Sequence, residues 1–181
     1  MYKIMKSKLK FTGERMIPEK NKNQDLFYEH LARYIFACQL VKGKNVLDAG
    51  CGVGYGSLLL SNLGLAKKVV GLDLSKGAIS YARSNYKNNI TSFVTGNVEN
   101  LSIFHDKSFD VISSFEVIEH LNNQQIFLKE VTRCLRIGGL FIVSTPNKDK
   151  LPNSNPYHTK EFSLSEFKKL LLKYFKFVKI Y

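Results

Sequence analysis

The sequence predicts a doubly wound α/β domain, in which helices cover both faces of a mostly parallel β-sheet. Short apolar runs typical of buried strands alternate along the chain with amphipathic helical patterns. Strands that alternate with helices of this length pair in parallel through right-handed crossovers. With 181 residues and no internal repeat or low-complexity linker, the chain is expected to form one three-layer domain with its own core.

The predicted elements begin after a basic tail and a segment that contains glycine and proline. A helical pattern over Asp25–Val41 precedes the first strand. Apolar runs bounded by turn residues predict strands at Asn45–Ala49, Lys68–Asp73, Thr91–Thr95, Phe109–Ser113, Leu140–Ser144 and Phe177–Tyr181. Helical spacing of the apolar residues between these runs predicts helices at Tyr55–Leu63, Lys76–Tyr86, Asn123–Leu135 and Leu164–Phe175.

The last of these helices has the clearest pattern. Ser163, followed three residues later by Glu166, matches a capping box at the start of the helix. Apolar residues then recur at the spacing of one helix face, at Phe167, Leu170, Leu171, Tyr174 and Phe175. The helix is therefore expected to carry a single apolar stripe.

The composition is that of a globular chain, with 44% apolar residues. No apolar stretch approaches the roughly 20 residues that a membrane span needs, and Met1–Lys10 lacks the apolar core of a secretory signal. The three cysteines are far apart and show no paired metal spacing. We therefore expect free thiols, no metal site and a cytoplasmic protein.

The net charge of +12 raises the question of a nucleic-acid partner. The excess is mainly lysine, however, and it is spread over the tail, several helix faces and the C-terminus. Solvated lysine-rich faces give the same total, and charge alone is a weak guide to a partner. Nucleic acid is therefore the less favoured alternative to a small-molecule substrate.

The segment from Asp48 to Gly56 is an apolar strand end that opens into alternating glycines. Glycine permits positive φ and lets a ligand approach the backbone closely. The dinucleotide-binding fingerprint requires Gly-x-Gly-x-x-Gly, and no frame of this segment supplies it. The order present is Asp-x-Gly-x-Gly-x-Gly, which disfavours a nucleotide-dependent oxidoreductase.

Asp73 ends the second predicted strand, one strand–helix–strand unit after the glycines. A carboxylate at this position can accept two hydrogen bonds from the hydroxyls of a ribose. Asp73 could instead be a turn acid or a helix N-cap, although Ser75 can cap the following helix without it. Because ligands of such sheets bind beyond the carboxyl ends of the strands, we favour ribose binding.

Four motifs, in order, resemble those of the class I S-adenosylmethionine-dependent methyltransferases. They are the glycine segment, the strand that ends in Asp73, and the segments Phe109–Leu121, with its Glu119-His120 pair, and Leu135–Asn147. The resemblance implies a Rossmann-like methyltransferase domain over residues 44–181, with S-adenosylmethionine as cofactor and S-adenosylhomocysteine as product. The cofactor contacts that it implies are Asp48, Gly50, Cys51, Gly52, Gly54, Asp73, Leu74, Asn97, Val98, Phe115 and Glu116.

Two of the expected cofactor contacts have an open alternative. Asn97 stands where family members commonly place an aspartate against the adenine amino group. Its amide oxygen can accept a hydrogen bond from that group, but the amide also donates. A role in a turn is the alternative interpretation. Within residues 1–43, which comprise the tail, a lid segment and a helix, Phe11–Glu19 resembles a lid of related enzymes. Arg15 could there pair with the methionine carboxylate, and an ordinary surface salt bridge explains it equally well.

Two histidines follow strands at the ligand end of the predicted sheet, and histidine is the natural base near neutral pH. His120 comes after the fourth strand, and His158 lies in the long loop Pro146–Phe162. That loop resembles those of methyltransferases that act on sugars or other small polar acceptors. A helix cap for His120 and a loop anchor for His158 are the structural alternatives to catalysis.

The expected function is methyl transfer to a small polar acceptor, such as a sugar or glycan precursor, at oxygen or nitrogen. An RNA methyltransferase and a non-catalytic cofactor-binding or partner-regulating domain are the alternatives. Family members usually end with a seventh, antiparallel strand, and this sequence supplies none after Phe177–Tyr181. The sheet edge is therefore expected to be exposed, or to be covered by a partner or by a second copy in a homodimer.

Overall fold

The computed structural model of the chain describes residues 25–150 and 155–181. The helices of these residues are α2 (Asp25–Cys38), α3 (Tyr55–Asn62), α4 (Lys76–Asn85), α5 (Gln124–Cys134) and α6 (Leu164–Leu171), with two short 3-10 turns, η1 (Ile118–His120) and η2 (Lys148–Lys150). The strands are β1 (Asn45–Ala49), β2 (Lys68–Asp73), β3 (Thr91–Thr95), β4 (Phe109–Phe115) and β5 (Leu135–Ser144). Arg15 and the lid predicted at Phe11–Glu19 lie outside the described residues.

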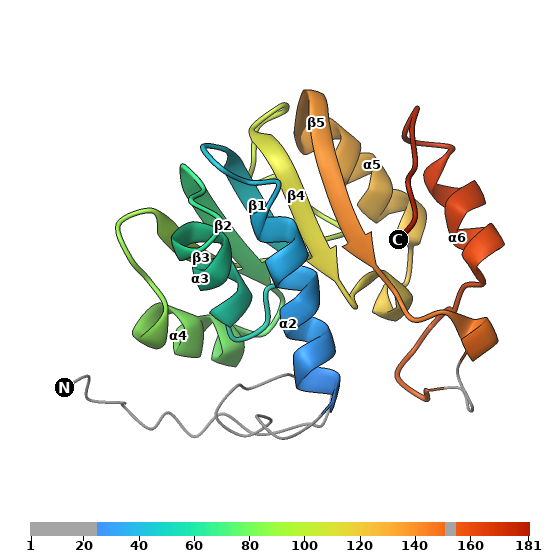
Figure 1. The fold of residues 1–181 in the computed structure, drawn as a ribbon, viewed down its shortest axis with the longest axis horizontal. Coiled ribbons are helices and arrows are strands. Elements are labelled where there is room, and N and C mark those ends of the chain that lie inside the picture. Colours follow the sequence, from blue (N-terminus) through green and yellow to red (C-terminus); the bar gives the residue numbers. More distant parts are fainter. Residues whose placement is uncertain (1–24, 151–154) are drawn as a thin grey trace.

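The five strands of the described residues form one sheet in the order β3-β2-β1-β4-β5, and every neighbouring pair is parallel (Figure 1). β1 lies at the centre, with β2 on one side and β4 on the other, so the strand order reverses beside β1. Doubly wound sheets bind ligands at such a reversal, beyond the carboxyl ends of the strands. The glycine segment follows β1 and therefore begins at this position.

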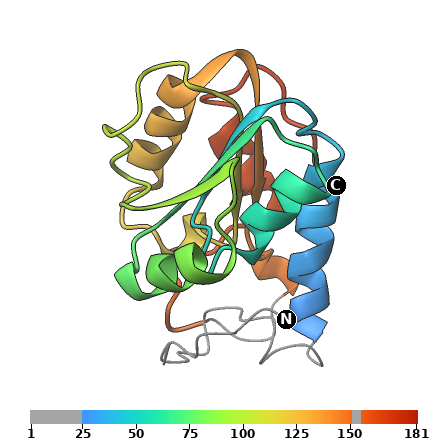
Figure 2. The same cartoon turned by 90° about the vertical axis from the view of Figure 1, so that its left-hand side faces the viewer.

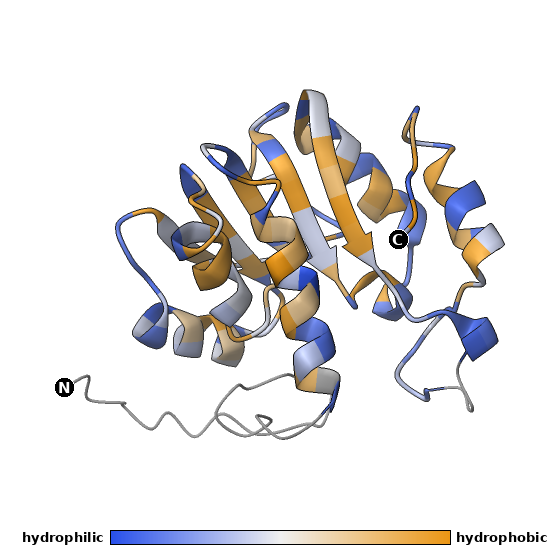
Figure 3. Cartoon of the chain, viewed as in Figure 1, coloured by the Kyte–Doolittle hydropathy of each residue, from blue (hydrophilic) through white to orange (hydrophobic). Residues whose placement is uncertain are grey.

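Helices α2, α3 and α4 cover one face of the sheet, and α5 and α6 cover the other (Figures 1 and 2). Neighbouring strand residues point to opposite faces. Val46 thus packs in the cluster under α2 and α3, whereas Leu47 packs with Phe127 of α5 and Phe167 of α6. The strands are largely apolar and the outer surfaces of the helices are more polar (Figure 3). Burial on both faces explains why the strands appear in the sequence as continuous apolar runs.

The predicted α/β fold class is confirmed, and the first three strands have their predicted bounds. β4 continues to Phe115 and β5 begins at Leu135, immediately after α5. A register shift between Phe109 and Val111 accommodates the extra residues of β5. The early part of β5 includes Gly138, which has positive φ, so its sequence does not show a strand pattern.

The last helix is shorter than predicted, although its start is as expected. The capping box is confirmed: the Ser163 hydroxyl accepts from the amide of Glu166 at 3.2 Å, and the Glu166 carboxylate accepts from the amide of Ser163 at 2.8 Å. α6 ends at Leu171, however, because the chain tightens into a turn in which the amide of Tyr174 donates to the Leu171 carbonyl at 3.0 Å.

The strand predicted at Phe177–Tyr181 is wrong, because these residues pair with no strand of the described chain. The terminal segment packs through its side chains instead. Phe175 stacks on Phe141 of β5 with 5.5 Å between the ring centroids, and Tyr181 contacts Phe36 of α2 at 4.9 Å. Since Phe141 and Phe36 belong to the cores on opposite faces of the sheet, the segment crosses the sheet edge beside β5 rather than extending it.

The described residues contain no helix with the length and apolar character needed to cross a membrane. The three cysteines are buried free thiols, as the sequence predicted.

Candidate functional site

Asp48 lies near the end of β1, with its side chain buried behind the glycine segment. Its carboxylate accepts hydrogen bonds from the hydroxyls of Ser57 at 2.7 Å, Ser113 at 3.0 Å and Tyr34 at 3.3 Å. These three side chains come from α3, β4 and α2, respectively. Asp48 thus links α2, α3 and β4 at the start of the glycine segment. Both of its carboxylate oxygens already accept hydrogen bonds from other residues of the chain.

Burial is the main cause that raises the pKa of Asp48 from 3.8 to about 6, and the hydrogen bonds from Ser57, Ser113 and Tyr34 oppose this rise. Between about pH 4 and pH 6 the native state therefore holds a proton that the unfolded chain has released. The free energy of unfolding is expected to fall across this window by roughly 3 kcal/mol more in the parent than in Asp48→Asn. Urea denaturation of both proteins at a series of pH values measures this difference, and parallel pH profiles would contradict it.

The glycines after β1 hold a backbone conformation that other residues rarely adopt. Gly50, Gly52 and Gly54 have φ values of 84°, 55° and 89°. The amides of Gly50 and Cys51 both donate to the carbonyl of Leu72, at 2.7 and 2.9 Å, which binds the loop to the end of β2. A Cβ at Gly50 would overlap the side chain of Val117, and Gly54 is equally enclosed. The loop therefore needs glycine at these positions for its backbone conformation and its packing.

Asp73 lies at the end of β2 beside the glycine loop. One of its carboxylate oxygens accepts from the amide of Gly52 at 2.9 Å, and the other accepts from the amide of Ser75 at 2.8 Å. Ser75 also caps α4, since its hydroxyl accepts from the amide of Ala78 at 3.2 Å. Each oxygen of Asp73 keeps a second lone pair for a further donor. The structure thus brings together the two cofactor elements that the sequence predicts.

The residues after β2 and β3 line the same edge of the sheet. Leu74 is 71% exposed although it is a large apolar side chain. Asn97 is exposed, and its amide oxygen accepts from the amide of Glu99 at 2.9 Å in a local turn. Val98 is buried in the core cluster that contains Leu72 and Leu101. The amide oxygen of Asn97 thus takes part in a local turn.

Phe115 and Glu116 end β4 and differ in their surroundings. Phe115 is buried and packs edge-on against Tyr34 with 4.9 Å between the ring centroids. Glu116 has a φ of 55°, a strained value for a residue with a side chain. The Ser144 hydroxyl donates to its carboxylate at 2.6 Å. This strain and the bond to β5 fix the direction of the Glu116 carboxylate.

Arg33 of α2 was not among the residues predicted from the sequence, and the structure places it beside Glu116. Its Nη2 atom lies 3.5 Å from Glu116 Oε1 and 3.7 Å from Glu29 Oε2. Its Nη1 atom is buried and has no hydrogen-bond partner in the described part of the chain. Buried donors without partners are rare, which makes Arg33 Nη1 a candidate donor to a ligand.

The two predicted histidines lie together, although they are far apart in the sequence. The rings of His120 and His158 contact edge-on with 4.9 Å between their centroids. Nδ1 of His120 lies 3.0 Å from the carbonyl oxygen of Tyr157, and Nδ1 of His158 lies 2.9 Å from a carboxylate oxygen of Glu161. Loop anchoring is therefore part of the role of His158, while the pairing of the two rings brings a polar cluster to the ligand edge of the sheet.

Glu119 completes this cluster. Its side chain is buried, one oxygen accepts from the Thr145 hydroxyl at 3.0 Å, and the other lies 3.9 Å from Nε2 of His120. Burial, followed by the negative charge of Glu116, raises the pKa of Glu119 to about 7. The Glu119 carbonyl also accepts from the amide of Thr159 at 2.8 Å, which fastens the loop that carries His158.

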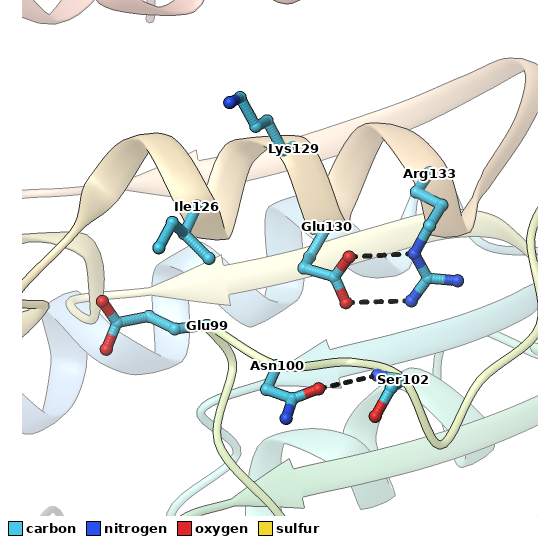
Figure 4. Close-up of a pocket in the computed structure, with 7 residues that line it drawn as sticks. All are labelled: Glu99, Asn100, Ser102, Ile126, Lys129, Glu130 and Arg133. Carbon is cyan, nitrogen blue, oxygen red and sulfur yellow. Dashed lines mark hydrogen bonds and ion pairs between the residues drawn. The ribbon is translucent and has the colours of Figure 1, made fainter.

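Two pockets of the described chain lie away from these residues. One, of about 480 Å³, lies between α5 and the loop after β3, where Glu130 and Arg133 bind each other through two 2.9 Å hydrogen bonds (Figure 4). The other lies at the amino ends of β1, β2 and β3 and is lined in part by Lys67, Lys68 and Lys87. Neither pocket contains a predicted site residue.

The sequence could not single out the supporting residues of the site. Ser57 and Ser113 look like ordinary small polar residues within a helix and a strand, and Arg33 lies in an unremarkable helical pattern. Only the fold brings them to Asp48 and Glu116. The Glu119-His120 pair was visible in the sequence, but only His120 of this pair was predicted to be a site residue.

Comparison with known proteins gives one family match, to the Methyltransferase domain, over residues 47–143. A relative from Mycolicibacterium smegmatis, named "Probable S-adenosylmethionine-dependent methyltransferase", is 38% identical over 91% of this chain and 64% of its own length. The mitochondrial ubiquinone biosynthesis O-methyltransferase of Dictyostelium discoideum is 40% identical over 60% of this chain and 37% of its own length. The chain thus spans less than two thirds of these curated relatives.

A similar fold occurs in a methyltransferase solved in complex with the Haloferax volcanii Trm112 methyltransferase activator. Its TM-score is 0.71 at 23% identity, over 86% of this chain and 71% of that one. At this identity the likeness concerns the fold alone.

Proposed function

Because the chain belongs to the Methyltransferase-domain family of class I S-adenosylmethionine-dependent methyltransferases, we propose that it transfers a methyl group from S-adenosylmethionine to a small polar acceptor, at oxygen or nitrogen. The observation that carries this proposal is the carboxylate of Asp73, held by the amide of Gly52 at 2.9 Å beside the reversal of strand order. A carboxylate that can accept hydrogen bonds from a ribose therefore lies beside a glycine backbone that a ligand can approach closely. Both are at the position where such sheets bind ligands.

The chemistry of four side chains supports the assignment of a part of the cofactor to each of them. The remaining lone pairs of Asp73 suit the two ribose hydroxyls, and the exposed face of Leu74 suits the adenine ring. The buried Nη1 donor of Arg33 suits the carboxylate of the methionine part, and the Glu116 carboxylate suits its ammonium group. Arg33 takes in this proposal the role that was one of the two alternatives for Arg15.

Bound S-adenosylmethionine supplies a methyl group that is already activated by the positive charge on its sulfur. The chain then has to hold the acceptor in line with that methyl group, exclude water and remove a proton from an acceptor hydroxyl. The cluster of Glu119, His120 and His158 lies beyond the carboxyl ends of β4 and β5. We assign proton removal to this cluster.

The acceptor is proposed to be a small molecule, and RNA the less favoured alternative. The lysines around the second pocket lie at the amino ends of the strands, whereas the glycine loop and Asp73 lie at the carboxyl ends. A polyanion bound by Lys67, Lys68 and Lys87 would therefore be held at the wrong edge of the sheet for methyl transfer. The relative from Dictyostelium is named for a small-molecule O-methyltransferase activity, in keeping with this choice.

A partner at the sheet edge is a further part of the proposal. Within the described residues β5 has a neighbour on one side only, and Ile137 in this strand is 90% exposed. Natural proteins usually cover or blunt such an edge. The terminal segment crosses this edge through Phe175 and Tyr181, and a second copy or a partner protein is proposed to cover the part that includes Ile137.

Calorimetric titration of the chain with S-adenosylhomocysteine and S-adenosylmethionine tests the cofactor assignment. We expect both compounds to bind with one site per chain. An assay for S-adenosylhomocysteine formation with a panel of small hydroxyl and amine compounds then separates an enzyme from a binding domain. Absence of binding to either compound would disprove the proposed function, and binding without turnover on any acceptor would favour the non-catalytic alternative.

A further inference from the structure

Three side chains of the kinds that bind metal ions lie together at the carboxyl ends of β4 and β5. They are Glu119 and His120, from η1, and His158, from the loop after β5. Each offers one ligand atom, and these atoms all lie within 4.8 Å of one another. The sequence predicted no metal site because it shows no paired ligand spacing. This group is assembled by the fold from two separate segments of the chain.

The Glu119 carboxylate has one oxygen that the described protein leaves unsatisfied. The side chain is 1% exposed, and its Oε2 atom accepts from the Thr145 hydroxyl at 3.0 Å. Its Oε1 atom is buried, has no hydrogen-bond partner in the described part of the chain, and lies 3.9 Å from Nε2 of His120. Burying a carboxylate oxygen without a donor is costly, so this atom points to a ligand that the protein itself does not supply.

The histidine rings are oriented as metal-binding histidines usually are. A carbonyl oxygen can only accept, so the contact of His120 Nδ1 with the Tyr157 carbonyl at 3.0 Å puts the proton on Nδ1 and the lone pair on Nε2. The contact of His158 Nδ1 with the Glu161 carboxylate at 2.9 Å favours the same tautomer. Most metal ligands of this type donate their other ring N–H to a carboxylate or carbonyl in this way.

We propose that Glu119, His120 and His158 bind one divalent transition-metal ion through a carboxylate oxygen and two imidazole nitrogens. Two imidazoles and one carboxylate suit zinc, iron, cobalt or manganese better than magnesium or calcium, and they leave coordination positions open. Ligand atoms around one such ion lie at most about 4.4 Å apart, so the rings would move inward slightly as the ion binds.

This inference rests on the proposed function for its role and favours oxygen over nitrogen as the acceptor atom. An acceptor hydroxyl at an open position of the ion has a lowered pKa and gives its proton to water. The oxygen then forms its bond to the methyl carbon as the carbon–sulfur bond breaks, and the sulfur leaves as the neutral thioether. The histidines act here as ligands, and the ion takes over the activation that the cluster would otherwise provide as a base.

Titration of the tag-free, chelator-treated full chain with cobalt chloride tests the site, followed by the visible absorbance of bound Co²⁺. One equivalent is expected to bind, with the intense bands of a four- or five-coordinate ion. His158→Ala and Glu119→Gln are expected to lose these bands, while His105→Ala, at an exposed histidine elsewhere on the surface, keeps them. Circular dichroism of each variant establishes that it is folded.

A variant that keeps all three metal ligands tests the site without removing any of them. Glu161→Gln keeps the shape of the residue that holds Nδ1 of His158, and it is expected to weaken Co²⁺ binding by about 10- to 100-fold. Equal binding in the parent, His158→Ala and Glu161→Gln would overturn the site. So would binding of well under one equivalent by the folded parent.

Calorimetry with S-adenosylhomocysteine on the same samples separates the two proposals. If this compound binds and Co²⁺ does not, the metal site is wrong and the proposed function stands. If Co²⁺ binds at the three residues and S-adenosylhomocysteine does not bind, the metal site stands while its assignment to methyl transfer fails together with the proposed function.

Discussion

Replacement of Asp73 by alanine is expected to weaken the binding of S-adenosylhomocysteine by about 5- to 150-fold. This range corresponds to the roughly 1–3 kcal/mol lost when hydrogen bonds to a charged group are removed. The variant loses the acceptors for the ribose hydroxyls, and it also releases the amides of Gly52 and Ser75, so the glycine loop is held less firmly. Calorimetric titration of the parent and the variant measures the change in affinity.

Two further variants sharpen this experiment. Asp73→Asn keeps one carbonyl oxygen but replaces the other oxygen by a donor, so its affinity is expected to fall between those of the parent and Asp73→Ala. Asp149→Ala removes an exposed acid that follows β5 and is expected to leave the affinity unchanged. Equal affinity of the parent and Asp73→Ala would remove Asp73 from the cofactor site.

Replacement of Gly54 by alanine is expected to lower the free energy of unfolding by about 2–5 kcal/mol. The backbone contributes about 1–2 kcal/mol, because φ at Gly54 is 89° and a Cβ strains that conformation. Overpacking contributes about 1–3 kcal/mol more, since the new Cβ would lie 2.6 Å from the ring of Phe93 and 2.7 Å from Cβ of Ala82. Urea denaturation monitored by circular dichroism gives the difference.

Gly43 provides the matched control for this variant. It also has positive φ, at 70°, but a Cβ added there would meet no atom within 4 Å. Gly43→Ala should therefore show the backbone contribution alone, about 1–2 kcal/mol. If Gly54→Ala is no less stable than Gly43→Ala, the packing of the glycine loop against α4 and β3 is not a constraint on the sequence at this position.

The order of strands and helices was predictable because a sheet buried on both faces leaves continuous apolar runs in the sequence. β1, β2 and β3 have their predicted bounds for this reason. The terminal segment Phe177–Tyr181 has the same apolar character, yet it forms no strand. Phe175 stacks on Phe141 on one face of the sheet edge, and Tyr181 contacts Phe36 on the other. A local pattern cannot distinguish an apolar run that pairs as a strand from one that makes only side-chain contacts.

Some residues of the candidate site could be predicted from the local sequence, and others could not. Glycines and acids at strand ends have a local signature, since a turn that meets a ligand needs glycine and a ribose needs a carboxylate. The partners of these residues have no such signature. Ser57 and Ser113 at Asp48, Arg33 at Glu116, and His158 at Glu119 are contacts between segments that only the folded chain brings together.

The sequence by itself determined the α/β class, and it predicted a ligand site at the glycine segment and Asp73, because short-range spacing carries both signals. The tertiary structure alone decided that Asp48 is buried among three hydroxyls, that Arg33 presents a buried donor, and that Glu119 meets two histidines. The physical reason is that hydrogen bonding, charge and metal binding act over a few ångströms in space. Residues that share such a contact need not be near each other along the chain.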